Sequence, residues 1–269
     1  MELKQIANNI RINIINQVAE ASSGHPGGSL SASEILTALY FDVMNLPSFD
    51  DPNRDRFILS KGHASPVLYA ALAEKGAFPK EELLTFRKIG SRLQGHPDMH
   101  KLPGVEMTAG SLGIGVGVSV GVALGAKLDE AKYNVFTLIG DGEIQEGSVW
   151  EAFMAAAHYK LDNFIAIIDN NNLQIDGTIE EVMSPYPIDE KMKAFGFNVI
   201  NINDGNDIEQ VIKALREAKE MCNSKPTAVI AKTVKGKGVS FMENNGSWHG
   251  TAPNAEQRAK ALEELGGNN

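Results

Sequence analysis

One stretch decides the fold: Val135-Phe136-Thr137-Leu138-Ile139-Gly140-Asp141-Gly142. Residues 135–139 have the composition of a buried strand, and residues 164–168 form a second run of this kind. Residues 146–159, between the two runs, have the apolar spacing of a helix. A strand–helix–strand unit makes the two strands parallel, so their carboxyl ends lie at one edge of a sheet. We therefore expect Asp141 and the asparagines at 170–172, which follow the two runs, to lie close together at the edge where such sheets bind ligands.

The residue types at this edge favour a metal and a phosphate. Asp141 and the amide oxygen of Asn171 are hard ligands suited to Mg²⁺, which usually keeps substrate phosphates among its other ligands. Gly142 has no side chain, so a diphosphate can approach its backbone closely. The alternative is that Gly-Asp-Gly forms a plain turn and the asparagines cap a loop. The position of both motifs after strand-like runs favours the ligand site.

The rest of the chain alternates between the two kinds of element. Helical spacing is found at 3–21, 65–75, 80–88 and 208–218. Strand-like runs are found at 56–60, 198–202 and 227–231, and loops are expected at 90–107, 170–187 and 232–250. Ser31, with Glu34 three residues later, is expected to cap a further helix. This alternation predicts an α/β protein whose mainly parallel sheet is covered on both faces, with residues 1–269 in a single domain.

Composition excludes several classes of function. The net charge of −9 and the absence of a basic run argue against a nucleic-acid partner. A single cysteine, Cys222, excludes an intrachain disulfide and fits a reducing cytoplasm. Residues 109–126 lack charge and approach the length of a spanning helix, but glycine and serine crowd them, so we expect no membrane span. The first residues lack the pattern of a signal peptide, and we expect a cytoplasmic protein.

Six motifs, in this order, resemble those of transketolase. They are Ser23-Gly24-His25-Pro26-Gly27-Gly28, Ser60-Lys61-Gly62-His63-Ala64, Gly95-His96-Pro97, Thr108-Ala109-Gly110-Ser111-Leu112-Gly113, Gly140-Asp141-Gly142-Glu143-Ile144-Gln145-Glu146-Gly147 and Trp248-His249-Gly250. The resemblance runs from about residue 4 to about 253 and concerns the N-terminal, diphosphate-binding domain of that enzyme. It implies the three-layer α/β/α thiamine diphosphate-binding fold, with thiamine diphosphate and Mg²⁺ (or Ca²⁺) as cofactors.

The resemblance also implies roles for the residues around the cofactor. Asp141 and Asn171 are expected to bind the metal through their side chains, and Leu173 through its backbone carbonyl. Gly110 is expected near the phosphates of the cofactor, and Leu112 against its thiazole ring. The other expected cofactor-binding residues are His63, Gly142, Glu146, Asn171 and His249. The acid matching Glu146 belongs to a buried network that links two active sites, although helix capping explains this residue nearly as well.

Four of the six histidines lie beside glycine in predicted loops. Each alone is more typical of a solvated residue, and their spacing matches no structural zinc site. Imidazoles do suit a reaction that moves protons among sugar hydroxyls and carbonyls near neutral pH. By the resemblance, His25 and His249 polarise the sugar oxygens and transfer protons, and His96 holds a hydroxyl of the two-carbon unit.

The function implied is that of the N-terminal subunit of a split transketolase, which moves a two-carbon ketol group between sugar phosphates. Its expected partner is a C-terminal subunit with the pyrimidine-binding and C-terminal domains, in an α₂β₂ assembly. Thr108 to Gly113 is expected to open a helix and form an anion site, and Gly113, Gly117, Gly121 and Gly125 to form a ridge for subunit contact. The alternatives are a ketolase for a branched or sulfonated sugar, a deoxyxylulose phosphate synthase-like enzyme, and a non-catalytic regulatory homologue.

Overall fold

The computed structural model describes residues 2–267 and contains a five-stranded sheet. The strands are β1 (Arg56–Leu59), β2 (Val135–Gly140), β3 (Phe164–Asn170), β4 (Asn198–Ile202) and β5 (Thr227–Lys232). Their order is β1-β2-β3-β5-β4, and neighbouring strands are parallel throughout. All five strands were predicted, with bounds that differ by at most a few residues. The carboxyl ends of the strands consequently lie at one edge of the sheet.

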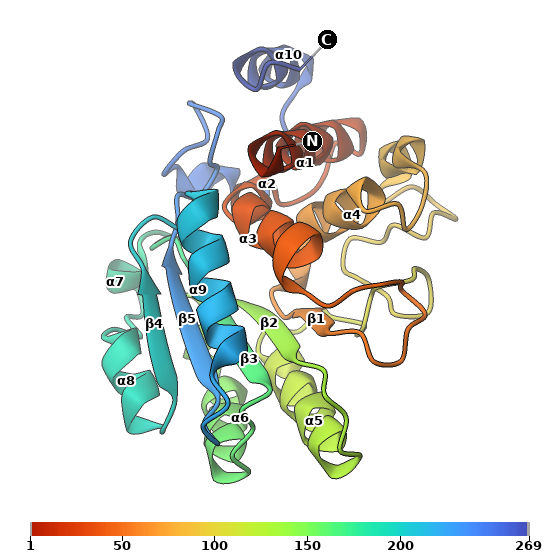
Figure 1. Ribbon diagram of the computed structural model, residues 1–269. Helices are drawn as coiled ribbons and strands as arrows, with labels where there is room; N and C mark the ends of the chain where they lie inside the picture. Colours follow the sequence, from red (N-terminus) through yellow and green to blue (C-terminus); the bar gives the residue numbers. More distant parts are fainter. Residues whose placement is uncertain (1, 268–269) are drawn as a thin grey trace.

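Helices cover both faces of this sheet (Figure 1). One side holds α1 (Leu3–Glu20), α3 (Ser33–Ala38), α4 (Ser65–Glu74) and α9 (Ile208–Glu220). The other side holds α5 (Ile114–Leu128), α6 (Gly147–His158) and α8 (Ile188–Ala194). Shorter helices are α2 (Pro26–Leu30) and α7 (Ile179–Val182), and α10 (Ala255–Glu264) packs against α1. The predicted three-layer α/β/α architecture is confirmed.

Alternation along the central strands divides the core into two layers. Phe136 and Leu138 of β2 belong to the cluster under α1, α3, α4 and α9. Val135 and Ile139 belong to the cluster under α5, α6 and α8. A strand that is covered on both faces has to be apolar at successive positions. This requirement explains why the sequence reads as continuous apolar runs rather than as alternating apolar and polar residues.

Two local predictions were wrong. The helix expected at 80–88 is a 3₁₀ helix, Lys80–Thr85, and the chain turns at Arg87, whose φ of 59° is left-handed. Ser31 does not cap α3, because that helix begins at Ser33 with Ala32 as its N-cap. The Ser31 hydroxyl instead donates a hydrogen bond to the buried carboxylate of Asp169. A serine that satisfies a buried acid is not distinguishable in sequence from a serine that caps a helix.

The glycine-rich segment also differs from its prediction. The helix does not open at Thr108: α5 begins at Ile114, and residues 108–113 are irregular. Gly113 is the N-cap with a φ of 83°, and a Cβ there would lie 2.6 Å from the Ser148 hydroxyl, so this glycine packs inside the chain. A Cβ at Gly117, Gly121 or Gly125 would meet no atom within 4 Å, so these three glycines form an open strip on α5.

Four of the α-helices described between residues 2 and 267 lie outside the predicted set, and one of them is α2. α7 falls within the loop expected at 170–187, and Thr178 and Glu181 form a capping box at its start. α8 and α10 were not predicted, since each presents few apolar residues in sequence. A search of the helices between residues 2 and 267 finds none with the length and apolar character needed to cross a membrane.

Candidate functional site

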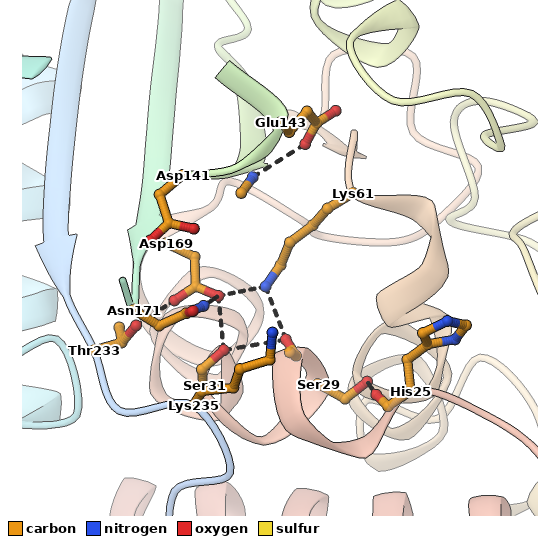
Figure 2. A network of polar contacts seen from close by, with 12 residues as sticks. His25, Ser29, Ser31, Lys61, Asp141, Glu143, Asp169, Asn171, Thr233 and Lys235 are labelled. Atoms are coloured by element: carbon orange, nitrogen blue, oxygen red, sulfur yellow. Dashed lines mark hydrogen bonds and ion pairs between the residues drawn. The ribbon is translucent and has the colours of Figure 1, made fainter. Parts of the chain in front are cut away.

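A cavity of about 350 Å³ opens at the carboxyl edge of the sheet. Its walls come from segments that follow β1, β2, β3 and β5, together with the start of α2 and Leu112 before α5. Figure 2 shows the polar groups that gather on this side of the sheet. The cavity is lined by the predicted residues His25, His63, Leu112, Asp141, Gly142, Glu146, Asn171, Leu173 and His249. Topology therefore brings together residues from position 25 to position 249 of the sequence.

Asp141 is a buried carboxylate directly after β2, with 2% of its surface exposed. Its Oδ1 accepts a hydrogen bond from Gly142 N at 2.9 Å, and its Oδ2 accepts one from Asn172 N at 2.6 Å. Burial, and then the negative charge of Asp169, raise the pKa of Asp141 to about 7. The surroundings therefore disfavour the ionised Asp141 carboxylate, and a cation bound nearby would stabilise it.

Two neutral oxygens lie on the loop after β3. Asn171 Oδ1 accepts a hydrogen bond from Leu173 N at 3.2 Å, and the Leu173 carbonyl accepts one from Lys235 Nζ at 3.1 Å. Among residues 2–267, no group of three or more His, Cys, Asp and Glu side chains could hold a metal ion. A site here would use one carboxylate, one amide oxygen and one carbonyl oxygen. This donor set fits Mg²⁺ or Ca²⁺, which take oxygen ligands and leave positions for phosphate.

Two lysines in the cavity lining were missed by the sequence analysis. Lys61 Nζ donates to the carbonyl of Gly28 at 2.8 Å and forms an ion pair with Asp169. Lys235 Nζ lies 2.9 Å from His249 Nδ1. Burial, and then the charge of Lys61, lower the pKa of Lys235 to about 8. Both lysines stand in segments noted for their glycine and histidine. Lys61 is the one basic residue of its motif besides the histidine, but residues 232–250 also contain Lys232 and Lys237, so no sequence signal distinguished Lys235.

Three imidazoles form a cluster in the cavity. The ring centroids of His25 and His63 are 5.1 Å apart, those of His25 and His249 5.4 Å, and those of His63 and His249 5.3 Å. Burial is the main cause that lowers the pKa of His25 to about 4, that of His249 to about 3, and that of His63 well below its ordinary value. Nearby positive charges act in the same direction. The three rings are therefore neutral at pH 7 and can each both accept and donate a hydrogen bond.

Two predicted site residues, His96 and Gly110, lie outside the cavity lining. His96 is exposed and outside the lining, although its charge, after burial and Arg87, helps to lower the pKa of His25. Gly110 is also outside the lining, next to Gly62, where an added Cβ would lie 3.5 Å from Gly110 N. Gly142 lines the cavity, but a Cβ there would meet Gln174 at an ordinary 3.4 Å. Packing alone thus does not demand glycine at position 142.

Two glutamates after the Gly-Asp-Gly turn have different environments. Glu146 is the N-cap of α6, yet its side chain makes no capping hydrogen bond and is exposed beside the cavity. Glu143, which the sequence analysis did not single out, is buried. Its Oε1 accepts from Gly113 N at 2.8 Å and its Oε2 from Gly140 N at 3.0 Å. Glu143 therefore fastens the segment that ends at Gly113 to the end of β2.

Residues 3–269 match a family described as the transketolase thiamine diphosphate binding domain. The chain belongs to the transketolase family. Two of its transketolase relatives have similar length. An apulose-4-phosphate transketolase subunit of Phocaeicola vulgatus is 45% identical over 267 residues, which are 98% of this chain and 93% of that one. The 6-deoxy-6-sulfo-D-fructose transketolase subunit SqwG of a Clostridium species is 42% identical over 267 residues, 98% of this chain and 96% of that one.

Other members of the transketolase family are much longer. The transketolase of Homo sapiens is 44% identical over 268 residues, which are 98% of this chain but 42% of that protein. The crystal structure of Campylobacter jejuni transketolase superposes with a TM-score of 0.91 at 35% identity, covering all of this chain and 44% of that one. The chain thus spans about two fifths of the length of these transketolases.

Proposed function

We propose that this chain is the N-terminal subunit of a thiamine diphosphate-dependent transketolase, which transfers a two-carbon ketol group from a ketose phosphate to an aldose phosphate. The observation behind the proposal is the cavity itself. It combines oxygen donors for a divalent metal, two lysine ammonium groups and a cluster of neutral imidazoles. The cofactor, when bound, would supply the chemistry that cleaves the carbon–carbon bond beside the ketose carbonyl. The protein supplies position, charge and proton transfer.

The end of the cavity nearest the strands is assigned to the diphosphate. Asp141, Asn171 and the carbonyl of Leu173 would hold Mg²⁺ or Ca²⁺. The ammonium groups of Lys61 and Lys235 line the same space. Lys61 is paired with Asp169, so the attraction for a polyanion is assigned to Lys235. The other cofactor contacts proposed are His63, Gly110, Leu112, Gly142 and Glu146.

The imidazole cluster is assigned to the sugar. His25 and His249 are neutral near pH 7 because burial lowers the pKa of each ring. A neutral ring can accept a proton from one sugar hydroxyl and return it to another oxygen, which is the role we assign to both residues. His96, which is exposed and outside the cavity lining, would hold a hydroxyl of the two-carbon unit. His249 also contacts Lys235, so it lies between the sugar side and the diphosphate side.

We further propose that the partner is a separate C-terminal subunit, in a cytoplasmic α₂β₂ assembly. Relatives of this chain's length have names that describe them as transketolase subunits, which supports the existence of a partner. The Glu146 side chain is exposed beside the cavity and makes no capping hydrogen bond, a position suited to a contact across subunits. The open strip of Gly117, Gly121 and Gly125, next to the exposed Ile114 and Val118, offers a flat surface for a second copy.

A second candidate concerns the sugar. Two relatives that match nearly their whole length to this chain are named for apulose-4-phosphate and for 6-deoxy-6-sulfo-D-fructose. A split ketolase for a branched or sulfonated sugar is therefore an alternative with the same chemistry. Turnover of such sugars, and not of ordinary pentose and hexose phosphates, would favour this alternative.

The test is reconstitution. The purified chain, saturated with thiamine diphosphate and Mg²⁺, should show no ketol transfer, and addition of the partner subunit should produce it. Aldose product would be followed by mass spectrometry with ordinary, branched and sulfonated ketoses in parallel. Robust transfer by this chain alone would contradict the split enzyme. Cofactor binding without turnover beside its partner would favour a non-catalytic regulator.

A further inference from the structure

Asp169, near the end of the central strand β3, joins four of the segments that surround the cavity. It is fully buried, with 0% of its surface exposed. Its carboxylate accepts hydrogen bonds from Ser31 at 2.7 Å, from Asn171 Nδ2 at 3.1 Å and from Thr233, and it forms an ion pair with Lys61. Figure 2 shows these side chains converging on one acid. They follow β1, β3 and β5 or lie just before α3.

The contact with Asn171 determines which end of that amide faces Asp169. Asp169 Oδ2 also accepts from the Lys61 ammonium, a group that can only donate. The oxygen is therefore an acceptor, and Asn171 must turn its NH₂ toward it. The amide oxygen of Asn171 then lies on the other side, where it accepts from Leu173 N. With the amide reversed, its oxygen would face the carboxylate and its NH₂ would face the Leu173 N–H.

This orientation matters because an amide binds a cation only through its oxygen. The reversed amide would present two N–H donors, in place of an oxygen, to the space that the Asp141 carboxylate also lines. The Asp169 side chain does not line the cavity, so it acts through its hydrogen bond rather than as a ligand. We infer that Asp169 is a positioning residue: it fixes the Asn171 amide with the oxygen available to the divalent metal. This inference rests on the proposed function.

Three variants of the full chain test the assignment, with Mn²⁺ as the probe. The measurement is the electron paramagnetic resonance signal of free Mn²⁺ during titration, with saturating thiamine diphosphate, and needs no catalysis. Asp169→Ala should weaken Mn²⁺ binding about 10–100-fold, the usual effect of removing a group that orients a metal ligand. Asp169→Asn should recover most of the affinity, because an amide oxygen can still accept from Asn171.

Thr233→Val is the matched control. It removes another buried partner of the same carboxylate, on Oδ1 rather than on Oδ2. The control should lower the thermal unfolding midpoint and leave Mn²⁺ affinity within about threefold of the wild type, well short of the effect of losing an orienting partner. The inference is overturned if Asp169→Ala binds Mn²⁺ like the wild type, if Asp169→Asn is as weak as Asp169→Ala, or if Thr233→Val is equally weak. A wild-type chain that binds no Mn²⁺ with the cofactor would overturn the proposed function as well.

Discussion

Replacing Asp141 by asparagine should have opposite effects on stability without and with the cofactor. In the metal-free chain the Asp141 carboxylate is buried near the charge of Asp169, and its pKa rises from 3.8 to about 7. Ionising this group at high pH therefore destabilises the folded state. Asp141→Asn removes the charge at constant shape. The same change removes an anionic metal ligand, so it should abolish the stabilisation that Mg²⁺ and thiamine diphosphate provide.

The magnitude follows from the pKa and from two hydrogen bonds. At about 1.4 kcal/mol per pKa unit, the rise disfavours the folded metal-free protein by about 4 kcal/mol at pH 8. The carboxylate accepts from the backbone N–H groups of Gly142 and Asn172, and an asparagine oxygen can satisfy only one of them. The lost acceptor costs about 1–3 kcal/mol. The metal-free variant should therefore be more stable than the wild type by about 1–3 kcal/mol at pH 8.

The advantage of the variant is lost at low pH, and its sign reverses with ligand. An acid with a raised pKa destabilises the fold progressively less as pH falls toward its unfolded pKa of about 4, so the advantage of the variant should be gone before pH 4 is reached. With ligand at 1,000 times its dissociation constant, the wild type gains about 4.1 kcal/mol, which exceeds the advantage of the metal-free variant, and the variant should gain little. Differential scanning calorimetry at pH 8, with EDTA or with Mg²⁺ and thiamine diphosphate, measures both. A metal-free variant less stable than the wild type, or one stabilised equally by cofactor, would refute the reasoning.

Four further changes test the remaining roles. Because burial lowers the pKa of His25 to about 4, the wild type should lose stability as pH falls from about 6.5 toward 4. Thermal unfolding should show that His25→Asn loses less stability than the wild type over this range, by about 1–2 kcal/mol, a value that allows for partial exposure of the ring. Glu143→Gln should lower the unfolding midpoint by several degrees, because the NH₂ of the new glutamine must face a backbone N–H donor. Lys235→Met should weaken thiamine diphosphate binding about tenfold by calorimetry. The matched change Lys237→Met, at a partly exposed lysine paired with Glu243, should not. His249→Ala in the reconstituted enzyme should lower kcat about 10²–10⁴-fold, and a loss under threefold would remove its assigned role.

Much of the fold was predictable because it depends on local pattern. Strands buried on both faces leave continuous apolar runs, and the parallel topology follows from the helices between them. The same reasoning placed Asp141 and Asn171 at one edge, where the structure has them. The short helices were not predictable in this way: α8 depends on packing against β4, and the 3₁₀ helix at Lys80–Thr85 ends where Arg87 adopts a left-handed conformation.

The groups missed in the site depend on tertiary contacts. Lys61 and Lys235 look like surface lysines in sequence, because the carboxylate and the carbonyl that accept their hydrogen bonds are distant along the chain. Glu143 looks like part of a turn, although it satisfies a backbone N–H thirty residues away, at Gly113. Pattern reveals which face of an element is buried, but it does not reveal which buried polar group meets which partner.

The charged groups of the cavity that lack an ion-pair partner indicate which kind of ligand it binds. Lys61 is neutralised by Asp169, whereas neither Asp141 nor Lys235 forms an ion pair within 4.0 Å among residues 2–267. Both groups are buried, and burial shifts each pKa against its charged form, upward for Asp141 and downward for Lys235. A simple anion would relieve only the lysine, and a metal ion only the aspartate. A divalent metal bound to a diphosphate satisfies both at once, so the metal and the phosphate should bind more tightly together than either does alone.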